Sequence, residues 1–395
     1  MIPLLRLTPA RRAAPLLVVS PLVLFSALAA GAADEPFQTT VYRSGKDGYH
    51  TYRIPSLIVT AQGTLLAFCE GRKNDRRDHG DIDLILKRSA DGGKTWGPLE
   101  LVHEEGGTKK VTIGNPCPVV DVATGTLWLT FCRDNDRVFV THSTDDGRTW
   151  APPRDITKDV KKEGWGWYAT GPGVGIHLRR GAHKGRLVIP CDHRERVEGN
   201  WVMFSHVFFS DDRGRTWKLG GSVAPHTDEC QVVELADGRL LINMRNYWGR
   251  AGKRPERGGM RALSWSRDGG ATWSDLRFDA TLIEPICQAS FIRHSVADIR
   301  RGKPAPPGNR LLFSNPASRT QRVQLTVRLS RDEGESWPVS RVLHGGPSAY
   351  SCLTALPGGR VGCLYEGGAK SPYEEIRFAG FSLEWLGGGK HPATP

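Results

Sequence analysis

The sequence lacks the patterns that mark most metal enzymes and nucleic-acid-binding proteins. It has no CxxC pair and no HExxH motif, and its twelve histidines are dispersed along 395 residues, so neither a metal nor another cofactor is expected. No long lysine or arginine run occurs despite a formal charge of +12, which argues against nucleic-acid binding and favours a basic surface facing acidic ligands. No dozen residues beyond position 32 form a helical apolar stripe, so we do not expect helices to build the core.

The N-terminal region has the composition of an export signal. Three arginines precede an apolar stretch over residues 13–30, and Ala30-Gly31-Ala32 offers a small-residue cleavage site. Two prolines interrupt this stretch, and it is shorter than the about 20 residues of a membrane span. We predict a signal peptide at residues 1–32 and a secreted or periplasmic mature chain without a membrane span; a retained anchor is the weaker alternative.

The eight cysteines leave the question of disulfides open. An exported protein can form disulfide bonds, but a domain of this size does not need them. Most of the cysteines lie inside apolar, strand-like runs, so buried thiols fit the pattern at least as well as bridges.

One short pattern, Ser-x-Asp-x-Gly-x-Thr/Ser-Trp, occurs five times. The copies span Ser89 to Trp96, Ser143 to Trp150, Ser210 to Trp217, Ser266 to Trp273 and Ser330 to Trp337. Their tryptophans are separated by 54, 67, 56 and 64 residues, a period that indicates a solenoid, an array or a propeller.

Each copy has the chemistry of a turn. In the first copy, Asp91 is expected to accept a hydrogen bond from the backbone N–H two residues on, and Gly93 to adopt a positive φ. Trp96 is expected to bury its ring against a neighbouring repeat. Because the same chemistry recurs five times, we assign these aspartates to the scaffold and not to catalysis.

Short β-branched and apolar stretches between the turns predict antiparallel strands. Examples are Arg53 to Thr60, Thr64 to Phe68, Ile82 to Lys87, Thr126 to Phe131, Arg186 to Ile189, Leu240 to Met244 and Gln324 to Leu329. We predict an all-β, six-bladed β-propeller of four-stranded antiparallel blades, with about 60 residues per blade and one blade without a recognisable turn. Residues 33–395 form this single domain, with a short tail after about 384, and a monomer is expected.

Three arginines lie in strand-like context in different repeats. Arg53 stands in Tyr52-Arg53-Ile54-Pro55, Arg245 in Asn243-Met244-Arg245-Asn246, and Arg322 in Thr320-Gln321-Arg322-Val323. If all three point to the central mouth, their guanidinium donors suit one carboxylate, whose two oxygens they match bidentately.

These arginines and further motifs occur in the same order as in the exo-α-sialidase (neuraminidase) family, which the chain resembles over about residues 42–383. The motifs are the Arg-Ile-Pro segment at Arg53, the repeated Asp boxes, Asp228-Glu229-Cys230-Gln231-Val232, Asn243-Met244-Arg245, Ala349-Tyr350-Ser351 and Cys363-Leu364-Tyr365-Glu366. Asp boxes alone occur in other propellers; the combination with the arginine, tyrosine and glutamate motifs is specific.

The resemblance implies a pocket that binds the carboxylate of a terminal sialic acid through Arg53, Arg245 and Arg322. Glu366 matches the glutamate that orients the first of these arginines. Tyr350 matches the nucleophile and Glu229 its base. A neutral phenol suits this substrate, because an anionic nucleophile would approach the substrate's own carboxylate against like charge.

The acid/base aspartate is expected in the polar loop after Glu70-Gly71-Arg72. Asp78 fits the family's position best, and Asp75 is its main rival. Arg72 matches a further arginine near the carboxylate or the O4 region, and Asn115 matches a residue of the N-acetyl pocket, although an asparagine before proline is also a common turn residue. The sequence also places Gln288 at the mouth. The segment Cys191-Asp192-His193-Arg194 stands where some family members present tyrosines to the glycerol tail.

The expected activity is retaining hydrolysis of terminal α-linked sialic acids on oligosaccharides, glycoproteins or glycolipids. A sialyl transferase would share every residue named above and would differ in acceptor-site aromatics, for which Trp165, Trp167 and Trp248 are available. A sialoside-binding propeller without turnover would keep the arginines but would have no use for Tyr350, Glu229 and Asp78. An unrelated Asp-box scaffold would need neither the three arginines nor the catalytic candidates Tyr350, Glu229 and Asp78.

Overall fold

The computed structural model describes Met1 and residues 35–249, 255–296 and 308–388. The contacts between its residues divide the chain into two units, Met1–Ala32 and Ala33–Pro395. All the strands and helices described below belong to the second unit. The predicted signal peptide lies outside the described residues apart from Met1.

Four sheets of the second unit consist of strands that pair antiparallel with their neighbours. The first contains β2 (Thr51–Val59), β3 (Leu65–Arg72), β4 (Ile82–Ser89) and β5 (Glu100–His103). The second contains β6 (Ile113–Val120), β7 (Leu127–Arg133), β8 (Arg137–Ser143) and β9 (Arg154–Asp155). The third contains β10 (Tyr168–Thr170), β11 (Ile176–His177), β12 (Leu187–Val197), β13 (Asn200–Ser210) and β14 (Lys218–Pro225). The fourth contains β15 (Thr227–Glu234), β16 (Leu240–Asn246), β17 (Met260–Ser266) and β18 (Arg277–Ile283).

The fifth sheet has seven strands and joins the two ends of the described chain. It contains β19 (Ser290–Ser295), β20 (Arg310–Pro316), β21 (Val323–Ser330), β22 (Val339–Ala355), β23 (Val361–Gly367), β24 (Glu375–Phe381) and β1 (Phe37–Arg43). The long strand β22 pairs with β21 through residues 339–347 and with β23 through residues 348–355. Because β1 pairs with β24, the N-terminal strand completes the sheet that the C-terminal strands begin.

Helices contribute little. In the described part of the chain, the α-helices are α1 (Thr157–Val160) and α2 (Leu383–Gly387), and 3-10 turns include η2 (Pro255–Arg257) and η4 (Pro357–Gly359). Among the described residues, none of the helices has the length and apolar character required to cross a bilayer.

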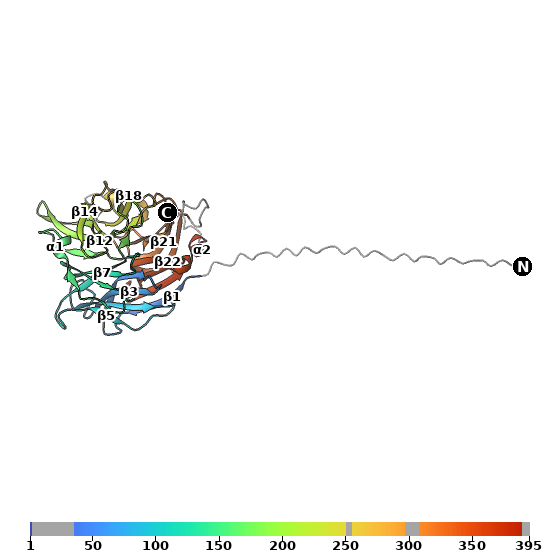
Figure 1. Cartoon of the computed structure of the whole chain (residues 1–395), viewed down its shortest axis with the longest axis horizontal. Coiled ribbons are helices and arrows are strands. Elements are labelled where there is room, and N and C mark those ends of the chain that lie inside the picture. Colours follow the sequence, from blue (N-terminus) through green and yellow to red (C-terminus); the bar gives the residue numbers. More distant parts are fainter. Residues whose placement is uncertain (2–34, 250–254, 297–307, 389–395) are drawn as a thin grey trace. The chain divides into compact units, whose positions relative to one another are not determined.

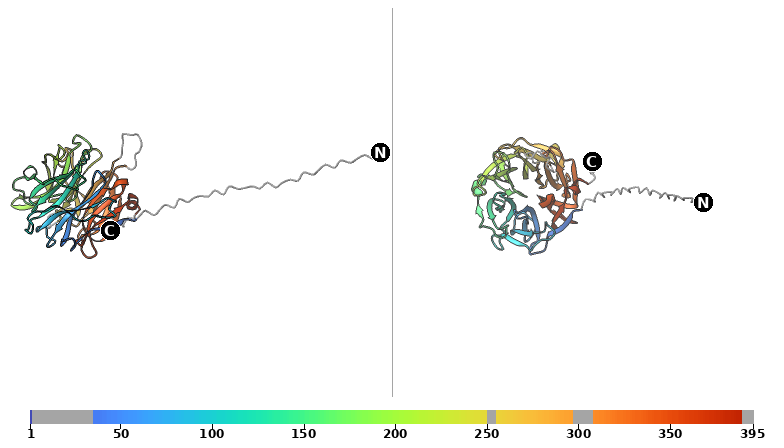
Figure 2. Two further views of the ribbon diagram at one scale, coloured as in Figure 1. Left: turned by 60° about the horizontal axis from the view of Figure 1, so that its bottom comes forward. Right: turned by 45° about the vertical axis from the view of Figure 1, so that its right-hand side comes forward.

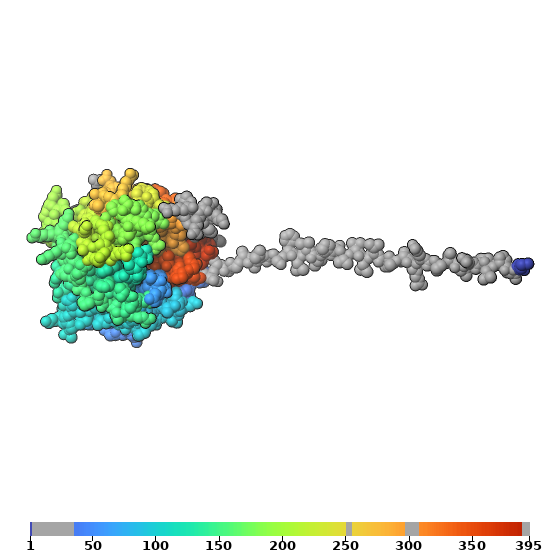
Figure 3. Space-filling model, viewed as in Figure 1, coloured from blue at the N-terminus to red at the C-terminus, as the bar shows by residue number. Residues whose placement is uncertain are grey.

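The sheets follow one another around a central axis in sequence order, from β2 and β3 to β21 and β22 (Figures 1 and 2). The fold is therefore an all-β, propeller-like one, as predicted, and each of the seven apolar stretches named above overlaps a strand. Side chains fill the spaces between neighbouring ribbons on the face seen in Figure 3. Buried apolar clusters lie between successive sheets, for example between β3 and β7, where Phe68 and Leu129 belong to one cluster.

Each Asp-box turn connects the third and fourth strands of a sheet or half-sheet. In the first copy, Asp91 Oδ1 accepts from the Thr95 amide at 2.9 Å, Asp91 Oδ2 accepts from the Thr95 hydroxyl at 2.6 Å, and the Ser89 hydroxyl accepts from the Gly93 amide at 2.8 Å. The other four copies repeat these contacts. The predicted reach of two residues was wrong, because the carboxylate reaches four residues on. The positive φ of Gly93, 92°, is confirmed.

The box tryptophans pack against the preceding sheet, as predicted. Trp150, which follows β8, meets Phe68 of β3 edge-on with ring centroids 5.8 Å apart. Trp217, which follows β13, meets Trp128 of β7 at 6.2 Å. The repeated turn therefore fastens each sheet to its neighbour.

Candidate active site

β-Bulges interrupt the strands that carry four of the candidate site residues, Arg53, Asn115, Glu229 and Tyr350. The pairing shifts between Arg53 and Ser56 in β2, between Gly114 and Cys117 in β6, between Thr227 and Cys230 in β15, and between Ser348 and Ser351 in β22. A bulge bends its strand and re-aims the side chains at that point. Since β2 contacts both β6 and β22, these bulges bring residues far apart in sequence to one mouth.

The hydroxyl of Tyr350 is hydrogen-bonded to the carboxylate of Glu229. The phenol donates to Glu229 Oε1, and Arg245 Nη1 lies 2.6 Å from Glu229 Oε2 and 3.2 Å from the phenol oxygen. Tyr350 is only 5% exposed. A phenol, a base and a cation are therefore assembled within hydrogen-bonding distance, although residues 229 and 350 come from different sheets.

Burial raises the pKa of Tyr350 well above its ordinary value, and the negative charge of Glu229 raises it further, whereas Arg245, Arg322 and Arg53 oppose the shift. The phenol is therefore neutral in the free protein at physiological pH. Its proton already points to the group that would accept it.

Three guanidinium groups from three sheets surround this phenol. The guanidinium carbons of Arg53 and Arg322 lie 5.2 Å and 5.6 Å from the centre of the Tyr350 ring, and Arg245 contacts the hydroxyl. The structure thus brings together the three arginines that sequence analysis selected. Such a group of fixed donors is suited to binding one small anion above the phenol.

Glu366 on β23 holds both Arg53 and the backbone near Tyr350. Glu366 Oε1 lies 2.6 Å from Arg53 Nε and accepts from the Ile54 amide at 3.0 Å, while Oε2 accepts from the Tyr350 amide at 3.1 Å. Glu366 is fully buried. Ile54 has a φ of 59°, an unusual conformation for a β-branched residue, so the buried carboxylate stabilises the bulge as well as the arginine.

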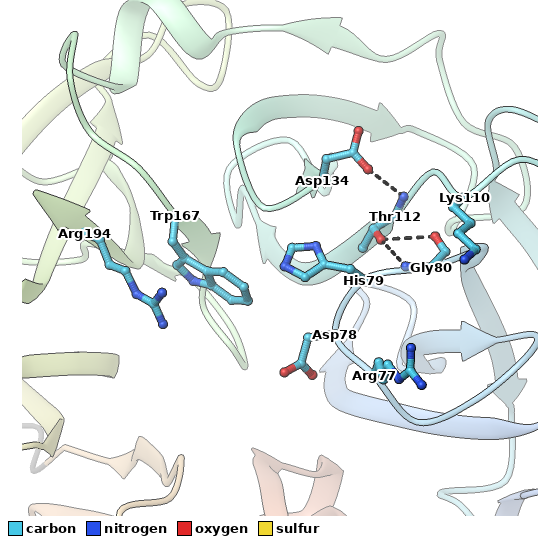
Figure 4. Close-up of a pocket in the computed structure, with 9 residues that line it drawn as sticks. All are labelled: Arg77, Asp78, His79, Gly80, Lys110, Thr112, Asp134, Trp167 and Arg194. Carbon is cyan, nitrogen blue, oxygen red and sulfur yellow. Dashed lines mark hydrogen bonds between the residues drawn. The ribbon is translucent and has the colours of Figure 1, made fainter. Parts of the chain in front are cut away.

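Asp78 is connected to the site through Arg72. Arg72 Nη1 lies 2.9 Å from Asp78 Oδ1, and Arg72 Nη2 lies 2.6 Å from Glu70 Oε2. The Asp78 side chain is 61% exposed and is one of the residues that line a pocket (Figure 4). Asp75, the rival, instead accepts from the Arg77 amide of its own loop at 2.8 Å. The geometry therefore favours Asp78 as the group that contacts a ligand.

Asn115 lies at the bulge of β6, next to this loop. Its backbone N–H donates to Glu70 Oε1 at 2.9 Å, and its side-chain Nδ2 donates to Asn135 Oδ1 at 2.6 Å. Asn135 Nδ2 in turn donates to the Asp78 carbonyl at 3.2 Å. Asn115 has a φ of 57°, so it combines a turn-like backbone with a buried position near the mouth.

Sequence analysis missed Tyr373, which lies between β23 and β24. Its hydroxyl accepts from Arg322 Nη1 at 2.9 Å, and its ring lies 4.3 Å from the Arg53 guanidinium carbon. No motif marks this residue, because its role arises only when the loop folds over two arginines.

Two buried carboxyl groups, Asp192 and Asp228, lie behind Arg245. Asp228 Oδ2 is 3.6 Å from Arg245 Nε, and Asp192 Oδ2 accepts from the Trp167 indole N–H at 3.1 Å. Burial, followed by the charge of Asp228, raises the pKa of Asp192 well above its ordinary value. Burial also raises the pKa of Asp228, and the charge of Arg245 opposes that shift.

Several secondary predictions can now be judged. The placement of Gln288 at the mouth was wrong: it is 1% exposed, and its amide is bonded to the Ser351 backbone N–H and carbonyl at 3.0 Å. All eight cysteines are buried free thiols. Trp165 is buried, whereas Trp167 borders the pocket beside Asp78. Within the described ranges, no three His, Cys, Asp or Glu side chains converge as a metal site.

Comparisons with known proteins show the family of the chain. Residues 63–363 match the family model of the BNR repeat-like domain. The chain is 36% identical to a sialidase of Micromonospora viridifaciens, over 98% of this chain and 60% of that protein, and 32% identical to Sialidase-2 of Mus musculus, over 87% and 95%. The solved Hadza microbial sialidase Hz136 is 32% identical with a TM-score of 0.77, over 88% of this chain and 69% of that one. The chain thus spans about 60% of the length of the Micromonospora relative.

Proposed function

This chain belongs to the sialidase family of glycoside hydrolases, and on that premise we propose that it is an exo-α-sialidase, which removes terminal α-linked sialic acids from glycoconjugates with retention of configuration. The observation that carries the proposal is the hydrogen bond from the Tyr350 hydroxyl to Glu229 inside a ring of three guanidinium groups.

Arg53, Arg245 and Arg322 bind the carboxylate of the sialic acid. Guanidinium donors match the two carboxylate oxygens bidentately. Arg53 and Arg245 are already oriented by Glu366 and Glu229, at 2.6 Å each, so little side-chain freedom remains to be lost on binding. The anomeric carbon, which bears this carboxylate, is thereby held above Tyr350.

In the first step, the Tyr350 oxygen attacks the anomeric carbon and its proton passes to Glu229. At the same time, Asp78 protonates the glycosidic oxygen, and the bond from that oxygen to the anomeric carbon breaks. The neutral phenol avoids the repulsion that a carboxylate nucleophile would experience from the substrate carboxylate. The arginines stabilise the oxocarbenium-like transition state by holding the adjacent negative charge in place.

In the second step, Asp78 accepts a proton from water, which attacks the anomeric carbon, and Glu229 returns its proton to the departing phenolate. Two inversions at one carbon retain the configuration. Arg72 keeps the exposed carboxyl group of Asp78 near the mouth through the 2.9 Å ion pair. Asn115 lines the pocket for the N-acetyl group.

The test is hydrolysis of a fluorogenic α-sialoside by the wild type and by Tyr350→Phe, Asp78→Asn and Asp75→Asn. Tyr350→Phe should lower kcat by at least about 100-fold. Asp78→Asn should lower kcat for a poor leaving group such as lactose by about 100-fold or more, and less for the fluorogenic alcohol. Asp75→Asn is the matched control from the same loop. Equal rates for wild type and Tyr350→Phe would contradict the mechanism, and binding without release by the wild type would indicate a sialoside-binding propeller.

Sialyl transfer is the second candidate function, because Trp167 lies beside Asp78 where an acceptor sugar could stack. Incubation of a sialoside donor with excess lactose distinguishes the two reactions. A new sialyllactose product would favour transfer, and free sialic acid alone would favour hydrolysis.

We further propose that the propeller has six blades and that the mature protein is a secreted or periplasmic monomer. Strand β22 would serve two blades, since its first half pairs with β21 and its second half with β23. One buried cluster contains Leu312 of β20 together with Cys363 and Tyr365 of β23. It packs the two halves of the seven-stranded sheet against each other. Mature N-terminal sequencing and sedimentation of the exported protein test the cleavage at residue 32 and the monomer.

A further inference from the structure

A pocket of about 650 Å³ adjoins Asp78 on the side where the β3–β4 loop approaches the third sheet (Figure 4). Its walls include Arg77 and His79 of that loop, Lys110 before β6, Trp167 before β10 and Arg194 on β12. The proposed mechanism uses none of these side chains.

Cationic groups dominate this pocket. Among the described residues, the Lys110 ammonium has no hydrogen bond or ion pair, and Arg194 has no carboxylate partner: its Nε donates to Met203 Sδ at 2.8 Å. Arg77 is 82% exposed and lies 3.5 Å from Asp75. The positive charges of Lys110 and Arg194 are therefore available to a ligand.

The two acidic side chains of the pocket are both engaged by other groups. Asp78 is paired with Arg72 at 2.9 Å, and Asp134 Oδ1 accepts from the Thr112 amide at 2.9 Å. Figure 4 places Asp78 between Arg194 on one side and Arg77 and Lys110 on the other. The cations thus flank the carboxyl group that faces the ligand.

Trp167 gives the pocket a flat apolar wall. The His79 ring meets the Trp167 ring edge-on at 5.6 Å, and the Arg194 guanidinium carbon lies 5.4 Å from the Trp167 ring centre. The indole N–H is bonded to Asp192 at 3.1 Å, which fixes the orientation of the ring. A fixed aromatic face suits the C–H face of a sugar, and cations beside it suit an anionic substituent.

We infer that this pocket is a subsite for the leaving-group sugar and that it selects leaving groups that carry a negative charge. The inference rests on the proposed function, because a general acid must contact the glycosidic oxygen and the sugar behind that oxygen then enters the space that Asp78 borders. The anionic group is either the carboxylate of a second sialic acid or a sulfate ester on the penultimate sugar.

Steady-state kinetics on four sialosides test this inference. The substrates are an α2,8-linked disialyl-lactose, a sulfated sialyllactose, 3′-sialyllactose, whose leaving group is neutral, and the methylumbelliferyl sialoside. The wild type should have a higher kcat/KM for both anionic leaving groups than for sialyllactose. This advantage should shrink between 50 and 500 mM salt, since exposed charges are screened over about 10 Å at 0.1 M. A gain for the disialyl substrate alone would identify the carboxylate, and a gain for both would indicate any anion.

Charge-neutralising variants locate the effect. Lys110→Gln and Arg194→Gln should each lower kcat/KM for the anionic leaving groups by about two- to fivefold, the range of exposed ion pairs, and have a smaller effect on the methylumbelliferyl sialoside. Lys109→Gln is the matched control, because it removes the same charge one residue away from the pocket lining. Equal kcat/KM for anionic and neutral leaving groups, or a uniform loss on all four substrates, would overturn the subsite.

A wild type that releases no sialic acid from any substrate would refute the proposed function separately. Calorimetric titration with the disialyl and the monosialyl ligand then tests, independently of turnover, whether the pocket binds an anionic leaving-group sugar. Tighter binding of the disialyl ligand that Lys110→Gln weakens would support the subsite, and equal binding would overturn it.

Discussion

Replacing Glu366 by glutamine tests how strongly one buried carboxylate organises the site. In the ion pair of Glu366 with Arg53 the side chains are 0% and 8% exposed, so water cannot compensate for loss of the charge. Removing one member of a buried pair typically costs about 3–5 kcal/mol. Glutamine can retain the contacts of Oε1, but its Nε2 would face the Tyr350 N–H, which now donates to Oε2 at 3.1 Å.

The expected result has two parts. Urea unfolding, followed by the fluorescence of the twelve tryptophans, should show Glu366→Gln destabilised by about 3–5 kcal/mol relative to wild type. In addition, KM for the fluorogenic sialoside should rise, because Arg53 loses the partner that fixes its orientation.

Glu335→Gln provides the control. Glu335 pairs with Arg277 at 2.7 Å, but these side chains are 60% and 42% exposed, and such surface pairs contribute about 0–1 kcal/mol. The reasoning fails if Glu366→Gln is no less stable than Glu335→Gln and its KM equals that of the wild type.

Two further predictions concern the Asp-box turns. Hydrogen bonds from the Thr95 side chain and backbone lower the pKa of Asp91 to about 2; its unfolded value is about 3.9, so the stabilisation is present above about pH 4 and lost as the pH falls toward 2. The urea midpoint of Asp91→Asn should therefore depend less on pH over this interval than the midpoint of the wild type. The same pH dependence in both proteins would contradict the stabilising role of the Asp91 carboxylate. Gly93→Ala should destabilise the fold by about 1–3 kcal/mol more than Gly92→Ala. A Cβ at Gly93 would lie 2.1 Å from a ring atom of Phe378, whereas a Cβ at Gly92 would have nothing within 4 Å. Equal unfolding midpoints for the two variants would contradict this prediction.

The sequence was sufficient for the parts of the fold that local chemistry determines. The Asp-box turns and the strands between them depend on residues within eight positions of one another, and both were predicted. The reach of Asp91 was misjudged, because the turn closes through the side chain and amide of Thr95, four residues on. The long strand β22 could not be anticipated, since its division between β21 and β23 depends on pairing with partners on both sides.

The candidate site was predictable only where family motifs marked it. Arg53, Arg245 and Tyr350 meet at the mouth as the resemblance implied. Tyr373 escaped notice because its contacts with two arginines depend on a loop position. Gln288 was misplaced because burial is set by packing of adjacent sheets, and nothing in its neighbouring residues reveals that its amide is used by the β22 backbone.

The charge of the site follows in part from what the bulges require. A bulge frees a backbone N–H from the ladder, and a buried N–H needs an acceptor. Glu366 supplies one for Ile54, and Glu70 supplies one for Asn115, from equivalent Glu-Gly positions at the ends of β23 and β3. A buried carboxylate in turn requires a cation, and Arg53, 313 positions before Glu366, provides it. The same glutamate thus stabilises the bulge and presents an arginine to the mouth, which explains why a scaffold feature and an anion-binding feature coincide at one strand end.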